Sequence, residues 1–222
     1  MGTMIKLTAS DGFVLSAYEA KPEVRARAGL VVIQEIFGVN AHIKRVADGY
    51  AMDGYHVISP AIFDRAEPNV ELGYDKSDME RGSALRSSIP LEATLLDLAA
   101  AVDALKGQGK VAIVGYCYGG SLAWLGATRL SGLSAAVGYY GGMIAKAADE
   151  KPKIPTMLHF GETDHSIPMS DVEIVKQKRP DVETFVYPAG HGFSCDERGS
   201  YHEPSHKQAL ERTLGLMKKC IG

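Results

Sequence analysis

One stretch, from Val111 to Leu125, restricts the fold of this chain more than any other. It opens on the apolar run Val-Ala-Ile-Val, which is typical of a buried strand, and it closes on residues that favour a helix. The turn between them reads Gly-Tyr-Cys-Tyr-Gly-Gly, so Cys117 lies in the pattern of a nucleophile elbow, with cysteine where serine is more usual. Such a turn would lift the Cys117 sulfur above the sheet and aim the backbone N–H of Tyr118 toward a developing oxyanion.

The glycines of this turn indicate a steric requirement. A nucleophile on a strained turn brings neighbouring backbone so close that side chains at positions 115 and 119 would clash. The alternative is a structural role for Cys117, because free cysteine is among the most buried residue types. The strand before Cys117 and the helix after it favour the nucleophile.

The composition is that of an ordinary globular protein, with 222 residues, 45% hydrophobic residues and a net charge of −3. The length suits one domain spanning residues 1–222, since no repeat or linker divides it. The charge gives no reason to expect a nucleic-acid partner, and no apolar run approaches the roughly 20 residues that cross a bilayer. The three cysteines lack metal-like CxxC spacing, so we expect free thiols in the cytoplasm, with no metal ion or other cofactor.

Apolar strands alternate with helical segments after one initial hairpin, whose turn is Asp11-Gly12. Strands are predicted at 4–10, 14–19, 29–34, 55–59, 111–114, 133–140, 154–160 and 182–187, and capping patterns start helices at Asn40, Ser77, Pro90, Ser170 and Ser200. This order predicts an α/β fold with a mostly parallel sheet, helices on both faces and an N-terminal antiparallel hairpin. The irregular stretch 61–74 and the helix after it are expected to lie across the mouth of the site.

Two further polar residues follow predicted strands, where sites form in open α/β sheets. Asp164 comes four residues after the strand 154–160, and His191 stands between two glycines after the strand 182–187. The order Cys117, Asp164, His191 is the nucleophile, acid and histidine order of α/β-hydrolases. Imidazole can take the thiol proton and return one to the leaving group, while the carboxylate fixes the tautomer of the ring.

Each of these residues has an ordinary explanation when it is taken alone. Asp164 could close an Asx turn, and His191 could be an exposed loop histidine. His165 competes for the role of base, but it directly follows Asp164, so the two side chains should diverge. Cys195, four residues after His191, could line the pocket. The remaining histidines lack such a setting: His42, His56, His159, His202 and His206.

Glu35 ends the predicted strand 29–34 in a position where a carboxylate is awkward to bury without a partner. It is either a solvated residue at the end of the strand or a carboxylate beside the thiol. The loop that it begins supplies the second oxyanion donor in this type of fold, which would be the backbone N–H of Ile36.

Four segments together make the chain resemble the dienelactone hydrolase (carboxymethylenebutenolidase) family. They are Gln-Glu-Ile-Phe-Gly at 34–38, Gly-Tyr-Cys-Tyr-Gly-Gly at 115–120, Gly-x-x-Asp at 161–164 and Ala-Gly-His-Gly-Phe at 189–193. The resemblance runs nearly end to end and implies an α/β-hydrolase fold and a cysteine-dependent hydrolase of enol lactones. It implies Cys117 as nucleophile, His191 as base and Asp164 as the residue that orients it. It also implies that Glu35 takes the thiol proton when substrate binds, so that thiolate forms only on demand and escapes oxidation.

The resemblance also implies which residues contact the substrate. Arg81 lies where the family has the first of two arginines that bind the substrate carboxylate, and Phe37 belongs to the shared 34–38 segment. At the position of the second arginine this chain has Cys195, with Arg198 three residues further on. Losing one such charge-assisted contact weakens carboxylate binding by about 1.5–3 kcal/mol.

We therefore expect a lactone or carboxylic-ester hydrolase with a small-molecule substrate, acting through an acyl-cysteine intermediate as a monomer or small homo-oligomer. The N–H groups of Ile36 and Tyr118 would stabilise the tetrahedral intermediate. One alternative is a thioesterase or acyltransferase for an uncharged acyl group. Another is a thiol-based redox or binding protein that kept the fold, although an ordered His191 and Asp164 would serve no purpose there.

Overall fold

The computed structural model describes residues 2–222, whose strands form one eight-stranded sheet in the order β1-β2-β4-β3-β5-β6-β7-β8. The β1–β2 and β2–β4 pairs are antiparallel, and the pairs from β4 through β8 are parallel. The predicted hairpin and the mostly parallel sheet are therefore confirmed. The strands are β1 (Thr3–Thr8), β2 (Val14–Ala20), β3 (Gly29–Ile33), β4 (His56–Pro60), β5 (Val111–Tyr116), β6 (Ala135–Tyr139), β7 (Thr156–Gly161) and β8 (Glu183–Tyr187).

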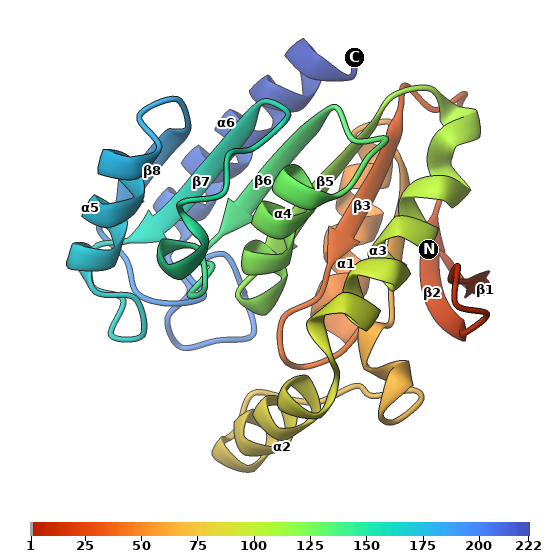
Figure 1. The fold of residues 1–222 in the computed structure, drawn as a ribbon, viewed down its shortest axis with the longest axis horizontal. Coiled ribbons are helices and arrows are strands. Elements are labelled where there is room, and N and C mark those ends of the chain that lie inside the picture. The colour runs from red at the N-terminus through yellow and green to blue at the C-terminus, as the bar shows by residue number, and fades with distance from the viewer. Residues whose placement is uncertain (1) are drawn as a thin grey trace.

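Helices cover both faces of the sheet, with α3 and α4 on one face and α1 and α6 on the other (Figure 1). Helix α2 stands apart, below the carboxyl ends of the parallel strands (Figure 1). None of the helices within residues 2–222 is long and apolar enough to span a membrane. The helices are α1 (Ala41–Met52), α2 (Lys76–Ser88), α3 (Leu91–Leu105), α4 (Tyr118–Arg129), α5 (Met169–Lys178) and α6 (Glu203–Cys220), with short 3₁₀ turns at Ile62–Arg65, Lys106–Gln108 and Ala145–Ala147.

The core lies in the middle of the sheet. Every residue of β3, β4, β5, β6 and β7 is buried, as expected for parallel strands that have helices on both faces. The edge strand β1 instead exposes most of its residues. The parallel strands therefore form a rigid platform, and the loops at their carboxyl ends carry the polar residues of the site.

Three of the predicted helix starts are wrong by a few residues. Asp75, rather than Ser77, caps α2 and accepts a 2.8 Å hydrogen bond from the N–H of Asp78. Helix α5 begins after Pro168, without a side-chain cap, instead of at Ser170. Helix α6 begins at Glu203, because the hydroxyl of Ser200 donates to a backbone carbonyl in the site loop instead of capping a helix.

Candidate active site

Cys117 joins β5 directly to α4 with a φ of 55°, a left-handed conformation that is strained for a residue with a side chain. A Cβ atom at Gly115 would overlap the carbonyl oxygen of Gly119, and one at Gly119 would lie 2.5 Å from the carbonyl oxygen of Ile33. The steric requirement predicted for both glycines is therefore confirmed. The tight turn holds the thiol at the carboxyl end of β5.

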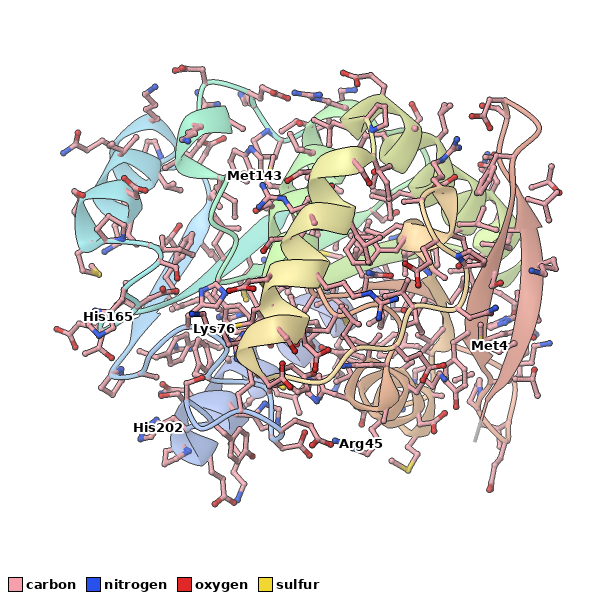
Figure 2. The ribbon with its side chains drawn as sticks, turned by 90° about the horizontal axis from the view of Figure 1, so that it is seen from below. Met4, Arg45, Lys76, Met143, His165 and His202 are labelled. Atoms are coloured by element: carbon pink, nitrogen blue, oxygen red, sulfur yellow. The ribbon has the colours of Figure 1, made fainter. Side chains whose placement is uncertain are left out.

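The structure brings Cys117, His191 and Asp164 into one chain of hydrogen bonds. Nε2 of His191 lies 3.2 Å from the Cys117 sulfur, and Nδ1 lies 2.7 Å from Oδ2 of Asp164. Oδ1 of Asp164 accepts from the backbone N–H groups of Ser166 and Ile167 at 2.8 and 3.1 Å, which fixes the carboxylate. His165 is exposed and points away at the edge of the molecule (Figure 2), so Asp164 and His165 diverge as predicted.

The environment of His191 favours its protonated form. Burial alone would lower the pKa of this ring, but the hydrogen bonds to Asp164 and Cys117 outweigh burial and raise the pKa to about 10. Because the charge of the sulfur contributes to this shift, the ring carries both protons when Cys117 is a thiolate, and it then donates to the carboxylate and to the sulfur. Such a ring can pass a proton to a leaving group on the substrate side.

Tyr140, which the sequence analysis missed, packs beside His191. It follows β6 in a left-handed conformation with a φ of 37°, and its ring centroid lies 5.2 Å from that of His191. The side chain is fully buried, and burial together with the charge of Glu35 raises its pKa. Its place at the end of a predicted strand is the only sequence signal that could have identified it.

The two predicted oxyanion donors border the same cleft. Within residues 2–222, neither the N–H of Ile36 nor that of Tyr118 donates a hydrogen bond, so both are available to a ligand. Helix α2 packs directly on the loop of Ile36, because a Cβ atom at Gly82 would overlap the Ile36 carbonyl oxygen. A glycine inside a helix was the signal for this contact, and the sequence analysis did not use it.

Glu35 is fully buried at the end of β3, so it is not a solvated residue. The Tyr74 hydroxyl donates to its Oε2 at 3.2 Å, and Nη1 of Arg198 lies 3.6 Å from its Oε1. Oε1 accepts no hydrogen bond from the described residues. The thiol of Cys117 bonds to His191 and not to Glu35, so a transfer of the thiol proton to Glu35 would require the thiol to turn.

A cleft of about 440 Å³ opens beside the thiol between α2 and the loops after β5, β6, β7 and β8. Besides His191, three of its lining residues are basic (Arg86, Lys146 and Arg198), and none is acidic. The guanidinium of Arg86 lies over the ring of Tyr118, 4.9 Å from its centroid. A cleft with this lining favours a ligand that carries negative charge.

Arg81, which was expected to contact substrate, does not line this cleft. Its exposed guanidinium pairs with Glu67 at the surface. Met79, Ser83 and Arg86 share the face of α2 that turns to the thiol, since they are spaced by four and three residues, and Arg81 projects from the opposite side. Figure 2 shows α2 crossing this end of the molecule from Lys76 toward Met143.

Of the other two residues predicted to contact the substrate, one lines the cleft and one does not. Phe37 lines the cleft as expected, but Cys195 is fully buried outside it and forms no part of its wall. Helix α2 lies across the mouth as predicted, whereas no residue of the 61–74 stretch is among those that line the cleft. Arg65 instead ties that stretch to helix α3 through two 2.8 Å hydrogen bonds to the buried carboxylate of Asp97.

Comparisons with known proteins agree on one family. The model of the dienelactone hydrolase family matches residues 15–221. A putative carboxymethylenebutenolidase of Synechocystis is 35% identical, over 92% of this chain and 91% of that protein. The carboxymethylenebutenolidase of Pseudomonas putida is 30% identical, over 96% and 94%. The crystal structure of a putative dienelactone hydrolase from Klebsiella pneumoniae has a TM-score of 0.84 at 29% identity and covers 97% of this chain and 98% of its own.

Proposed function

Because the chain belongs to the dienelactone hydrolase family, we propose that it hydrolyses lactones and carboxylic esters through an acyl-cysteine intermediate. The observation that carries this proposal is the unbroken chain of hydrogen bonds from the Cys117 sulfur through His191 to Asp164. It links a nucleophile on a strained turn to a base and to the carboxylate that orients the base. A redox or binding protein would have no use for this order.

In acylation, the Cys117 thiolate attacks the carbonyl carbon, and the oxygen that becomes negative accepts from the N–H groups of Ile36 and Tyr118. The intermediate collapses when the C–O bond to the leaving group breaks and Nε2 of His191 gives that oxygen its proton. The neutral ring then removes a proton from water, whose oxygen attacks the acyl-cysteine. Collapse of the second intermediate releases a carboxylic acid and restores the thiolate and the protonated ring.

Glu35 is proposed as the group that takes the proton of the resting thiol before attack and returns it to the thiolate after the product is released. Its complete burial behind the cleft supports this role, and so does its Oε1, which accepts no hydrogen bond from the described residues. The guanidinium of Arg198 lies close to Oε1 of Glu35 and also lines the cleft. A ligand in the cleft can therefore contact the same guanidinium that pairs with Glu35.

The basic lining supports an anionic substrate. Arg86 on α2 and Arg198 in the loop after β8 both line the cleft. Each can bind a carboxylate by charge-assisted hydrogen bonds. We therefore assign to Arg86 and Arg198 the role first expected of Arg81. The three free cysteines further support work in a reducing compartment such as the cytoplasm.

The test compares initial hydrolysis rates on a dienelactone with a carboxylate and on a short uncharged aryl ester. It uses the wild type, Cys117→Ala and, as a matched control, Cys220→Ser. We expect the wild type and the control to hydrolyse the dienelactone faster, and the alanine variant to hydrolyse neither. An active Cys117→Ala variant would overturn the cysteine mechanism, and a wild type inert on both substrates would overturn the substrate class.

A further inference from the structure

Three side chains with metal-ligating atoms meet behind the cleft. Glu35 lies just after β3, His42 lies in the first turn of α1, and Cys195 belongs to the loop after β8. One ligand atom from each lies within 4.8 Å of the others. All three residues are buried, with exposed fractions of 0%, 3% and 0%. We call these residues the buried cluster.

Two polar atoms of the buried cluster have no hydrogen-bond partner in the described part of the chain, although Nη1 of Arg198 lies 3.6 Å from one of them, Oε1 of Glu35. Oε1 of Glu35 and Nε2 of His42 are both inaccessible to solvent, and neither has a hydrogen-bond partner among residues 2–222. Buried polar atoms in folded proteins are almost always paired, and exceptions indicate a bound ion, a water molecule or a functional role. Two such atoms on residues whose ligand atoms lie within 4.8 Å of one another indicate an occupant that both residues can bind.

The neighbours of the buried cluster orient its lone pairs inward. Nδ1 of His42 lies 2.9 Å from Oδ1 of Asp196, so the ring proton belongs on Nδ1 and the Nε2 lone pair is free. The Tyr74 hydroxyl donates to Oε2 of Glu35 at 3.2 Å and leaves Oε1 free. Histidine ligands of metal ions typically donate their second nitrogen to a carboxylate in this way, and ligating carboxylates are hydrogen-bonded in turn.

We propose that Glu35, His42 and Cys195 bind a divalent transition-metal ion of the Zn²⁺ class. Imidazole nitrogen, carboxylate oxygen and thiolate sulfur are the ligands that Zn²⁺ prefers. With bonds of about 2.0–2.3 Å, tetrahedral ligand atoms stand roughly 3.5 Å apart, so binding draws these atoms together by little more than 1 Å. Water supplies the fourth ligand.

Binding exchanges a proton for the metal ion. A cysteine binds a metal ion as the thiolate, so the Cys195 thiol has to lose its proton when the bond forms. Formation of the sulfur–metal bond therefore releases one proton, and affinity falls as the pH is lowered. Of the buried cluster, only His42 lines the neighbouring cavity of about 290 Å³, whose wall also includes Asp196 and Arg45.

A second consequence rests on the proposed function. A metal ion on Oε1 of Glu35 would compete with the thiol proton for the same carboxylate, and it would displace the Arg198 guanidinium from Glu35. Metal binding at the buried cluster should therefore inhibit hydrolysis, and removal of the metal by a chelator should restore it.

The binding test uses the full chain in a Cys117→Ala background, which removes the thiol beside His191. Co²⁺ is titrated while absorption of the thiolate–cobalt bond is followed in the near ultraviolet, and Zn²⁺ is then added to displace it. We expect one equivalent to bind. Cys195→Ser and His42→Phe should each weaken binding by more than about 100-fold, and Asp196→Asn by about 10–100-fold. Cys220→Ser and His165→Phe serve as matched controls and should bind as the background does.

Folding of each variant is checked by its thermal midpoint, so that a loss of binding is not a loss of structure. Absence of Co²⁺ and Zn²⁺ binding in the folded background protein would overturn the site. Binding that Cys195→Ser and His42→Phe leave unchanged would overturn it as well. In the enzyme with Cys117 intact, we expect Zn²⁺ to inhibit hydrolysis far more than in Cys195→Ser. Binding without this difference would keep the metal site and remove the proposed role of Glu35.

Discussion

Two sets of side chains in this molecule contain a cysteine, a histidine and a carboxylate, and they are organised in opposite ways. In the set proposed to be catalytic (Cys117, His191 and Asp164, called the catalytic set below), each member hydrogen-bonds to the next at 3.2 and 2.7 Å. In the buried cluster of Cys195, His42 and Glu35, no member hydrogen-bonds to another, and one ligand atom from each lies within 4.8 Å of the others.

The difference shows how placement decides chemistry when the residue types are the same. The catalytic set stands at the ends of three parallel strands, in line, so a proton can pass along it. The members of the buried cluster are held from outside by Asp196 and Tyr74, which leaves their free atoms converging. A line of hydrogen bonds suits proton transfer, and converging lone pairs suit a cation.

Among substitutions that break a single hydrogen bond of the catalytic set, we expect Asp164→Asn to reduce the rate of hydrolysis most. We expect kcat to fall by about 10³–10⁴-fold, because an amide favours the wrong tautomer of the ring. The pKa of His191 should drop from about 10 toward or below 6.5, since the bond to Asp164 is the main influence that raises it and burial remains. Steady-state rates and an NMR titration of the ring measure both. If His191 keeps its wild-type pKa in this variant, Asp164 is not the residue that raises the pKa of the ring.

Glu35→Gln tests whether Glu35, a member of the buried cluster, takes part in the reaction at the catalytic set. We expect kcat/KM to fall by about 10²-fold, which is the lower range for loss of a group that transfers a proton. Rates are measured with a chelator present, so that metal binding does not contribute. A variant as fast as the wild type would separate the two sets completely.

Arg86→Met tests whether the basic lining of the cleft binds the carboxylate of the substrate. Arg81→Met is its matched control. Loss of one charge-assisted contact should raise KM for a carboxylate-bearing substrate by about tenfold or more, and Arg81→Met should leave it unchanged. KM for an uncharged aryl ester should not change in either variant. An effect of Arg81→Met equal to that of Arg86→Met would contradict the assigned face of α2.

The smallest expected effect is on the free energy of unfolding. The folded-state pKa of His191 is raised, so its ion pair with Asp164 stabilises the fold fully below pH 6.5, and this stability is lost as the pH rises toward 10. We therefore expect the difference in free energy of unfolding between the wild type and Asp164→Asn to shrink from pH 6 to pH 10. Urea denaturation at a series of pH values measures it. A difference that does not change with pH would show that the ion pair is absent.

The sequence predicts that Cys117, Asp164 and His191 meet, because each lies within four residues after a strand, and parallel strands bring their ends to one edge. It fails where position depends on packing between distant segments. Arg81 and Arg86 lie on one helix, and only the contact of Gly82 with the Ile36 loop decides which of them faces the thiol. His42 carries no motif, and its meeting with Cys195 depends on how α1 packs against the loop after β8.

The most direct test of the central claim is to trap and map the acyl-enzyme. The wild type is mixed with a chromogenic aryl ester, quenched in acid within the first turnover, digested and examined by mass spectrometry. We expect the acyl group on the peptide that contains Cys117, and none on the peptides that contain Cys195 or Cys220. Rapid turnover with no acyl group on Cys117, or with the acyl group on another residue, would contradict the account.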